Sequence, residues 1–312
     1  MQSPFLLVLQ LTKGTQEAII EKTEGYSMER YCDLHVHSTF SDGSFTPGEI
    51  LSLAEKAGLS AVALCDHNTL AGLPDLAEAA KHSPVKAVPG IEFSADYMGR
   101  EVHILGLFIP ERYYPKVKEF LKDILLKKER SNQELIRVLN RNGISISYED
   151  VQSSTPRGHV NRAVIAAEMV RKGYCKTVEE AFSQWLSTKR GLYTPPERPD
   201  ALCVIRFVKS IGAVSILAHP FLNLNEPELR HFLAEGKKNG LDGMEVYYPL
   251  FDREETSRLE NLAKEYGLCR SGGSDFHGDN KPDISIGTGK GNLKVPDFLL
   301  ERLAACRNSE GH

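Results

Sequence analysis

The sequence predicts an α/β fold that is interrupted by a helical insertion. Short apolar segments of strand length alternate with amphipathic helical segments from about residue 31 to 111, and again from about residue 199 onward. Between residues 112 and 198 this alternation stops, and charged helical segments replace it. The 312 residues are enough for one large α/β barrel or for two modest domains.

The first stretch of alternation contains four expected strands, at 31–36, 60–65, 86–93 and 101–109. The segment 60–65 is continuously apolar, which is typical of a strand in a parallel sheet covered on both faces. A helix is expected to begin after Thr46, because Pro47 and Glu49 favour a helix start and apolar residues then recur at helical spacing. A second helix is expected at 69–81, so this stretch predicts βαβ units.

The remaining elements divide into two groups. In the insertion we expect helices at 114–142, 161–172 and 178–186. After residue 200 we expect strands at 213–217, 243–246 and 269–271, and helices at 201–210, 227–239, 252–266 and 295–305. The predicted organisation is an N-terminal extension at 1–28, a barrel domain formed by 29–111 and 199–312, and a helical insertion domain at 112–198.

Composition excludes several classes of function. The net charge is −4, from 38 Lys and Arg against 42 Asp and Glu. Proteins that hold duplex DNA by its phosphates usually have a basic excess, so we expect no stable duplex binding. No apolar run approaches the length of a membrane span, and we expect no membrane association. The six cysteines form no CxxC pair, which is typical of free thiols in the cytoplasm.

Side chains that bind metals recur near the ends of successive expected strands. His35 and His37 are two residues apart on a strand, so their rings point to the same face. The carboxyl ends of parallel strands meet at one edge, where sites form. A single histidine at such a place is usually a structural residue, but the joint recurrence indicates a metal cluster. The candidate ligands are His35, His37, Asp42, His67, Glu92, His103, His219, Asp275 and His277.

Nine nitrogen and oxygen ligands are more than one ion needs, because zinc typically takes about four and hydrolytic sites about four to six. Two or three divalent ions are therefore expected. The set lacks thiolates, which suits Mn²⁺, Zn²⁺ or Fe²⁺. Clustered divalent ions activate water and stabilise charge on a phosphoryl group, so the predicted reaction is hydrolysis of a phosphate ester.

Six features of the chain resemble the successive motifs of one family. They are DLHVHSTFSDG, ALCDHNT, PGIEFS, the isolated His103, LAHP and GGSDFH, in this order over about 31–110 and 200–280. Together they resemble the PHP (polymerase and histidinol phosphatase) family. The resemblance implies a distorted (β/α)₇ TIM-like barrel with two or three metal ions. It also implies the activity of a metal-dependent phosphoesterase, a hydrolase of phosphoric ester bonds.

The resemblance also implies which residues share an ion. The implied sets are His35, His37, Glu92 and Asp275 for one ion, Glu92, His103 and His219 for a second, and Asp42, His67 and His277 for a third. Some family members have histidine where Asp42 stands, so the occupancy and identity of the third ion stay open. The residues assigned as catalytic are His35, His37, Glu92, His219, Asp275 and His277.

The insertion resembles that of the branch acting on nucleoside 3′,5′-bisphosphates and on the 5′ ends of short RNA. That branch typically carries Gly-Arg-Pro-His where this chain has Pro-Arg-Gly-His, so Arg157 and His159 match while glycine and proline are exchanged. With Arg162, they lie where a loop enters a helix and are predicted to bind a substrate phosphate. For Arg162, the alternative is an ordinary ion pair with Glu168 or Asp200. The expected partner is a small phosphorylated substrate, a nucleotide or short oligonucleotide.

Four further residues near the candidate ligands are considered, and two of them are assigned supporting roles. Asp66 and Asp33 lie next to candidate ligands and are expected to orient their neighbours. Tyr247 and Tyr248 follow an expected strand and either stack on a base or belong to the core.

Two other functions are kept as alternatives. A histidinol-phosphate phosphatase would share the fold and the metals, although the composition of the insertion argues mildly against it. A non-catalytic, metal-binding regulatory module would require lost ligands, and all nine positions are present.

Overall fold

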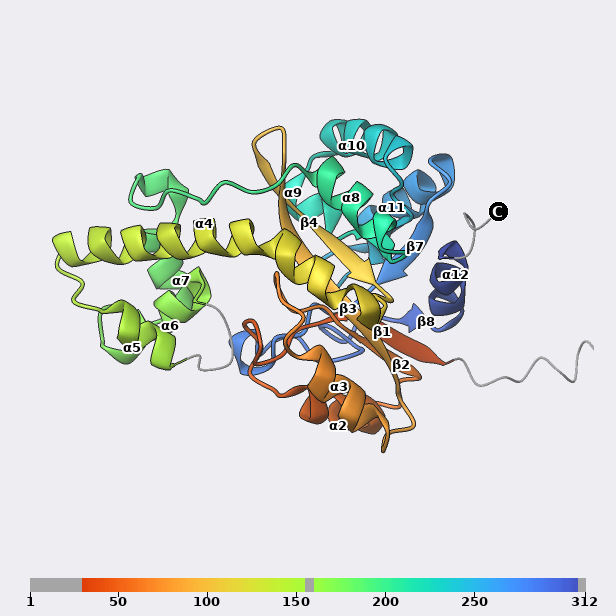
Figure 1. Cartoon of the computed structure of the whole chain (residues 1–312), viewed down its shortest axis with the longest axis horizontal. Helices are drawn as coiled ribbons and strands as arrows, with labels where there is room; N and C mark the ends of the chain where they lie inside the picture. Colours follow the sequence, from red (N-terminus) through yellow and green to blue (C-terminus); the bar gives the residue numbers. More distant parts are fainter. Residues whose placement is uncertain (1–29, 155–159, 308–312) are drawn as a thin grey trace, which may run out of the picture.

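The computed structural model describes residues 30–154 and 160–307 (Figure 1). Its centre is an eight-stranded sheet in the order β7-β6-β5-β4-β3-β2-β1-β8. The amide of His37 donates to the carbonyl of Phe276 at 2.9 Å, which joins the end of β1 to the segment after β7. The sheet therefore curls into a nearly closed, distorted barrel, and the predicted α/β fold is confirmed.

The strands are β1 (Tyr31–Val36), β2 (Ala61–Leu64), β3 (Lys86–Tyr97), β4 (Arg100–Leu107), β5 (Val214–Leu217), β6 (Gly243–Tyr247), β7 (Cys269–Gly272) and β8 (Val295–Pro296). All seven strands predicted from the sequence are confirmed, with ends that differ by a few residues. The eighth, β8, was expected to be the start of the last helix. It pairs antiparallel with β1 instead.

The βαβ pattern expected for this stretch does not extend to the third and fourth strands. β3 and β4 form an antiparallel hairpin, and Tyr97 pairs with Arg100 across the two-residue turn Met98-Gly99. Both turn residues have positive φ, 52° and 77°, which suits the right-handed twist of a tight hairpin. Since β4 also runs antiparallel to β5, one strand of the barrel enters the site from the opposite direction.

The helices outside the insertion are α2 (Pro47–Lys56), α3 (Leu73–Ala80), α8 (Ala201–Ser210), α9 (Pro220–Asn223), α10 (Glu226–Lys238), α11 (Arg253–Glu265) and α12 (Phe298–Cys306). Thr46 and Glu49 form a capping box at the start of α2, as the sequence indicates. The short helix α9 was not anticipated.

The core is divided by the period-two alternation of the strands. In β2, Val62 and Leu64 belong to the large cluster beneath the surrounding helices. Ala61 and Ala63 face the other way and belong to a second cluster with Leu303 of α12. Both faces of the strand are thus buried, which explains its continuous apolar sequence.

The insertion contains the 28-residue helix α4 (Tyr114–Arg141), followed by α5 (Tyr148–Ser153), α6 (Arg162–Arg171) and α7 (Val178–Ala181). The far half of α4 packs with α5 and α6 in a hydrophobic cluster of its own that includes Leu139, Val151 and Ile165. The domain boundaries at 28, 111 and 198 stay a prediction, and the expected extension at 1–28 lies outside the described residues. Among the described residues, no helix is both long and apolar enough to cross a membrane.

Candidate metal centre

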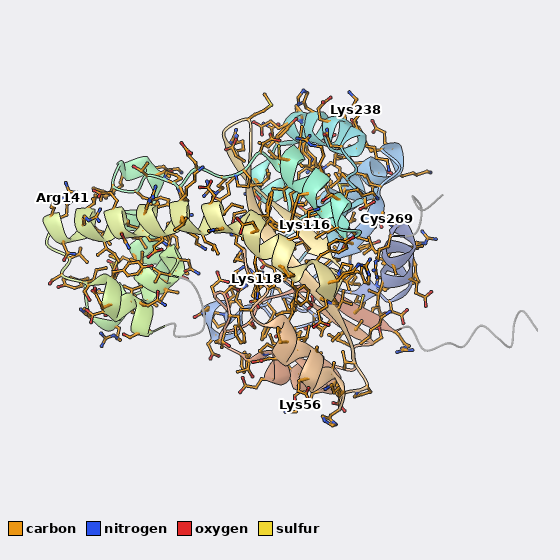
Figure 2. All side chains as sticks on the ribbon, in the orientation of Figure 1. Lys56, Lys116, Lys118, Arg141, Lys238 and Cys269 are labelled. Carbon is orange, nitrogen blue, oxygen red and sulfur yellow. The ribbon has the colours of Figure 1, made fainter. Side chains whose placement is uncertain are left out.

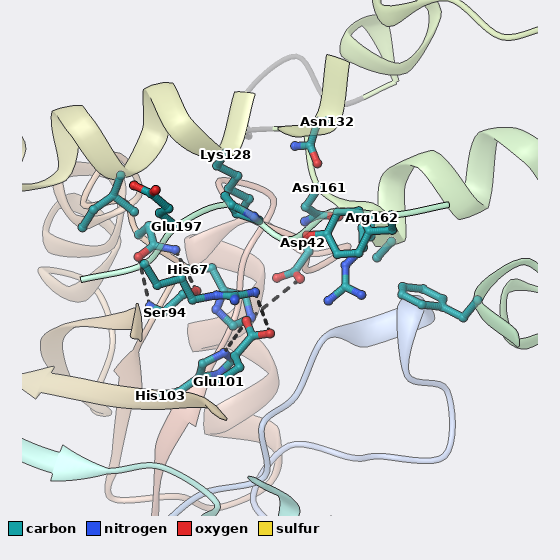
Figure 3. A pocket seen from close by; sticks show the side chains of 17 residues that line it. Asp42, His67, Ser94, Glu101, His103, Lys128, Asn132, Asn161, Arg162 and Glu197 are labelled. Atoms are coloured by element: carbon teal, nitrogen blue, oxygen red, sulfur yellow. Dashed lines mark hydrogen bonds and ion pairs between the residues drawn. The ribbon is translucent and has the colours of Figure 1, made fainter. Parts of the chain in front are cut away.

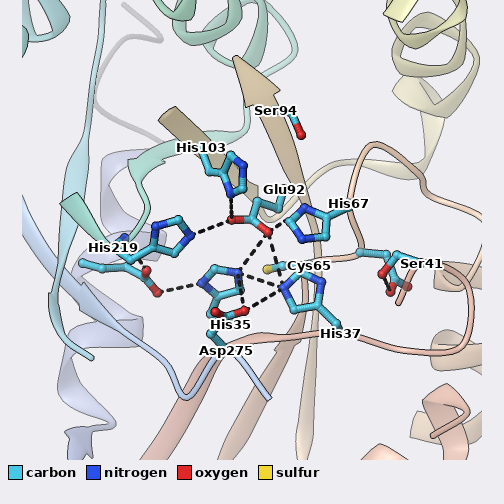
Figure 4. A network of polar contacts seen from close by, with 12 residues as sticks. His35, His37, Ser41, Cys65, His67, Glu92, Ser94, His103, His219 and Asp275 are labelled. Atoms are coloured by element: carbon cyan, nitrogen blue, oxygen red, sulfur yellow. Dashed lines mark hydrogen bonds and ion pairs between the residues drawn. The ribbon is translucent and has the colours of Figure 1, made fainter. Parts of the chain in front are cut away.

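The nine candidate ligands lie together at the mouth of the barrel, with Glu92 of β3 at their centre. Figure 4 labels seven of them, all except Asp42 and His277. Glu92 Oε1 lies 2.8 Å from His103 Nδ1 and 3.1 Å from His219 Nε2. Glu92 Oε2 lies 2.9 Å from His67 Nδ1 and 3.4 Å from Nε2 of both His35 and His37. Five imidazoles therefore surround one buried carboxylate.

A second group of donors extends from His37. Its Nε2 lies 3.1 Å from Asp275 Oδ1. Beyond it, His277 Nε2 lies 3.3 Å from Asp42 Oδ1, and His67 Nε2 lies 3.8 Å from Asp42 Oδ2. The turn that follows β1 thus places the carboxylate of Asp42 on the same side as His37.

His103 reaches the cluster differently from the other histidines. It lies in the middle of the antiparallel strand β4, opposite Ser94, and not beyond the end of a parallel strand. Because β3 and β4 form a hairpin, the His103 ring reaches Glu92, which lies two residues before Ser94 on β3. The idea that every ligand follows a parallel strand is therefore wrong for this one.

Glu245 of β6 is a functional candidate that the sequence reasoning missed. It is fully buried, and its Oε1 lies 3.0 Å from His35 Nδ1. Its Oε2 accepts a hydrogen bond of 2.8 Å from the backbone amide of His219. Glu245 therefore fixes the His35 ring with Nε2 toward the cluster, as carboxylates behind metal-binding histidines do. An acidic residue within the apolar segment Gly243–Val246 was the available clue.

Backbone strain is concentrated at this mouth. Asn68, His219 and Asp275 all have positive φ, of 52°, 27° and 54°. Non-glycine residues seldom adopt such values, and they persist only where surrounding contacts hold them. Here the Asp275 amide donates to the carbonyl of His35 at 2.8 Å. A Cβ on the neighbouring Gly273 would overlap the His35 backbone, so this close approach requires glycine.

Charges in the cluster suit metal binding. Burial raises the pKa of Glu92, but His67, His103 and His35 outweigh it and hold that pKa well below its usual range. Burial, with His277 and His67, holds the pKa of His37 well below its ordinary value, so this ring is neutral and keeps a lone pair. Against the effect of burial, the carboxylates Glu245 and Glu92 raise the pKa of His35 well above its ordinary value, and Glu92 with Glu101 raises the pKa of His103 to about 10. Because metal ligands must be deprotonated, a bound cation would displace the protons of these two rings.

Four buried atoms of the cluster make no hydrogen bond of acceptable geometry to a described residue, namely His37 Nδ1, Asp42 Oδ1, His67 Nδ1 and Glu92 Oε2. This holds although His67 Nδ1 and Glu92 Oε2 lie 2.9 Å apart, because distance alone does not align a donor hydrogen. Orphaned buried polar atoms are costly unless an ion or water satisfies them. Three sets of donor atoms each fall within 4.8 Å of one another: His37, Asp42, His67 and His277; His35, His37 and Glu92; and His67, Glu92 and His103. Of the nine, His219 and Asp275 belong to none of the three sets, but they touch Glu92 and His37 respectively. The residues present fit divalent cations.

Asp33 and Asp66 hold the loops that carry the ligands. Asp66 accepts hydrogen bonds from the amide of Ser38 at 2.7 Å and from the hydroxyl of Ser41 at 2.6 Å. Asp33 accepts from the amide of Ser274 at 2.9 Å. Both carboxylates accept hydrogen bonds from loop residues beside the ligands, and Asp33 also accepts one from the amide of His35 at 3.3 Å. Their role in orienting ligands stays a prediction.

The two tyrosines after β6 have other partners than a base. The hydroxyl of Tyr248 donates to Asp275 Oδ2 at 2.8 Å, and the hydroxyl of Tyr247 donates to Glu260 at 2.7 Å. Tyr248 is buried beside His219. The structure therefore favours the second interpretation of the sequence, in which these tyrosines belong to the core. Tyr248 also supports the candidate ligand Asp275.

A pocket of about 200 Å³ opens beside the cluster, between the barrel and the insertion (Figure 3). Asp42, His67 and His103 line its floor, and Lys128, Arg162 and Arg198 line its walls. Arg198 pairs with Glu101 at 2.7 Å, whereas Lys128 has no ion pair with a described residue. The pocket therefore places cations across from the candidate metal ligands.

Arg162 does not form the ion pair considered as an alternative. Glu168 pairs with Arg171 at 2.6 Å, and Asp200 caps α8. The guanidinium of Arg162 instead lies 4.5 Å from the ring centroid of Tyr193, within the pocket. Arg157 and His159 lie outside the described residues, and their assignment as substrate-binding residues stays a prediction.

Comparison with known proteins relates this arrangement to metal-dependent phosphoesterases, hydrolases of phosphoric ester bonds. The chain belongs to the PHP domain family, whose model matches residues 33–189. The resemblance inferred from the motifs is thereby confirmed.

Individual relatives cover most of the chain. A 5′-3′ exoribonuclease of Haemophilus influenzae is 32% identical over 80% of this chain and 91% of that protein. A phosphoribosyl 1,2-cyclic phosphate 1,2-diphosphodiesterase of Eggerthella lenta is 33% identical over 79% of this chain and 94% of that protein. A solved structure from Bifidobacterium adolescentis, assigned as a metal-dependent phosphoesterase, matches with a TM-score of 0.78 at 28% identity. It covers 89% of this chain and 96% of its own.

Proposed function

We propose that this chain hydrolyses phosphate monoesters of nucleotides, at the 5′ ends of short RNA or in nucleoside 3′,5′-bisphosphates. The observation that carries the proposal is the pocket in which Lys128 and Arg162 face the cluster of candidate ligands. An ester with a second phosphate can place one phosphate at the cluster and the other against these cations. Similarity to a 5′-3′ exoribonuclease supports a substrate of this class.

The proposed cofactors are two or three divalent ions, Mn²⁺, Zn²⁺ or Fe²⁺, held by the nine residues in the three sets implied by the family motifs. Such ions supply Lewis-acid chemistry, activating water and neutralising charge on the phosphoryl group. The chain's own residues determine where this chemistry occurs. Glu92 belongs to two of the sets: its Oε1 faces His103 and His219 of one set, and its Oε2 faces His35 and His37 of the other.

The remaining groups bind and orient the substrate. Arg162 and Lys128 supply donors for the phosphate that does not react, and Arg157 and His159 are proposed to add to them. A guanidinium binds phosphate through two parallel hydrogen bonds, whereas an ammonium acts as a point charge. Stacking on Tyr193 restricts the Arg162 guanidinium, so less side-chain freedom is lost when phosphate binds.

A second candidate substrate class is a cyclic phosphodiester of a sugar phosphate. The diphosphodiesterase of Eggerthella lenta is 33% identical to this chain, and the exoribonuclease is 32% identical. Histidinol phosphate stays a third possibility, and a non-catalytic metal-binding module is the alternative in which no ester is hydrolysed.

A hydrolysis screen with Mn²⁺ that measures released phosphate and also separates the organic products tests the proposal, because opening a cyclic diester releases no phosphate. Its substrates are 3′,5′-bisphosphates, AMP, 5′-phosphorylated short RNA, a cyclic ribose phosphate and histidinol phosphate. We expect the highest kcat/KM with the bisphosphate or the RNA. Preference for the cyclic diester or for histidinol phosphate would overturn the substrate assignment. No turnover of any ester by metal-loaded protein would favour the non-catalytic module.

Replacing Glu245 with Gln should test how much the orientation of His35 contributes to metal binding, because His35 itself is kept. The variant Glu245→Gln leaves the size of the side chain but weakens its hold on His35 Nδ1. We expect metal affinity to fall by about 10- to 100-fold, the usual effect of losing such a supporting carboxylate. Metal titration of the chelator-treated protein measures this, and the exposed Glu254→Gln on α11 is the control. Unchanged affinity would remove Glu245 from the support of the site.

A further inference from the structure

Helix α4 is strongly basic in a protein whose net charge is negative. Its 28 residues contain eight Lys and Arg against four Asp and Glu, a net charge of +4, whereas the whole chain carries −4. Figure 2 labels Lys116 and Lys118 on the half of the helix that lies over the barrel. Lys118 has no ion pair with any described residue. This local positive charge beside the candidate site suggests that α4 contacts an anionic ligand.

The pocket at the candidate ligands is too small for a whole oligonucleotide. Its volume of about 200 Å³ lies below the range of about 300–1,000 Å³ usual for small-molecule sites. A second hollow of about 710 Å³ adjoins it along α4, and Lys128 lines both. We call this second hollow the α4 groove; Lys118, Lys122, Leu125, Lys128, Tyr148 and Gln152 border it.

We propose that the α4 groove binds the 3′ continuation of a single-stranded RNA whose 5′ end lies at the candidate metal centre. The inference rests on the proposed function and selects an oligonucleotide as the substrate. A bound strand leaves the pocket past Lys128, so its following phosphates run along α4. From Lys118 to Lys128 the helix rises about 15 Å, enough for a few nucleotides.

The groove has the two features that single-stranded nucleic acid requires, cations for the backbone and an aromatic ring for a base. Lys118, Lys122 and Lys128 outnumber the two acidic residues that also line it, Glu119 and Glu129. The pair between Lys122 and Glu119 is 3.9 Å long and exposed, so it costs little to break.

Apolar and aromatic surface completes the groove. Tyr148 is half-buried at its far wall and offers a ring for stacking. Leu126, which is 47% exposed on α4, also lines the groove. These side chains suit bases and riboses, which a simple anion site would not need.

Binding of a non-hydrolysable strand tests the groove independently of turnover. The probe is a 5′-hydroxyl phosphorothioate RNA pentamer labelled at its 3′ end, measured by fluorescence anisotropy with the Mn²⁺-loaded protein. We expect the double variant Lys118→Ala, Lys122→Ala to weaken binding by about 10-fold. It should also reduce the slope of log K against log salt by about 1.4, since each phosphate contact on a single strand contributes about 0.7.

Three further variants complete the test. Tyr148→Ala should weaken binding by about 5- to 10-fold, and Tyr148→Phe should restore it, because the ring carries the stacking. Lys116→Ala is the matched control on the same helix; its ammonium bonds to Ser210 away from the groove. Melting curves identify any variant whose insertion is unfolded.

The outcomes separate this inference from the proposed function. Equal affinity and an equal salt slope for the wild type and the double lysine variant would overturn the RNA path. The same result with efficient bisphosphate hydrolysis would leave the proposed function intact. No hydrolysis of any nucleotide, with pentamer binding that still depends on the lysines and Tyr148, would overturn only the proposed function.

Discussion

Glu92→Gln should reduce turnover by about 10³-fold or more while the fold is retained. Glu92 contributes both oxygens to a cluster of five histidines, and its low pKa keeps it charged. An amide has nearly the same shape but offers one oxygen and no charge. We therefore expect the variant to lose at least one bound ion per chain, and with it the Lewis-acid contribution to hydrolysis.

Elemental analysis, circular dichroism and initial rates together check this expectation. Glu168→Gln is the matched control, because Glu168 is also a buried glutamate but lies in the insertion and pairs with Arg171. The control should keep full metal content and full activity. A Glu92→Gln protein with near wild-type kcat and full metal content would exclude Glu92 from the metal centre.

Arg162→Ala should lower kcat/KM for a 3′,5′-bisphosphate by about 10²- to 10³-fold, the scale of losing a charge-assisted donor in a site. The guanidinium lies in the pocket over Tyr193, across from Asp42 and His67. Arg162→Lys should restore only part of the rate, since an ammonium keeps the charge but lacks the planar fork. Metal content should not change, because the candidate ligands all come from the barrel.

The competing account is that Arg162 only packs the insertion against the pocket. That account predicts a lower melting temperature and equal losses for every substrate. The comparison is therefore made between a bisphosphate and p-nitrophenyl phosphate, which has no second phosphate and should be much less affected. Arg171→Ala, on the exposed side of the same helix, is the control. Equal losses for both substrates with a lower melting temperature would contradict a role in phosphate binding.

Local chemistry in the sequence was enough to predict most elements of this fold. The capping box of Thr46 and Glu49 acts within four residues, and the segment at 60–65 indicates a buried strand through its own continuous apolar sequence. His35 and His37 could be assigned to one site, because alternate residues of a strand point to the same face of the sheet. These inferences depend on neighbours along the chain.

The direction of β4 could not be obtained in this way. A strand shows the same alternation of side chains whether it runs parallel or antiparallel to its neighbour. The sequence signal for the hairpin was the short turn Met98-Gly99, which we did not identify as a hairpin turn. The consequence reaches the site, because His103 comes from the middle of this strand and not from its end. The role of Glu245 was likewise hidden, since its partners His35 and His219 are 210 and 26 residues away.

The sequence by itself determined most of the strands and helices and the nine candidate metal ligands, because these follow from residue type and short-range spacing, and its motifs indicated the family. Tertiary structure alone decided that Glu92 lies at the centre of five imidazoles, that Glu245 supports His35, and that Lys128 joins the pocket to the α4 groove. These facts depend on how the barrel curls and where the insertion packs against it. Contacts between distant segments are set by the packing of the whole chain, which local patterns do not encode.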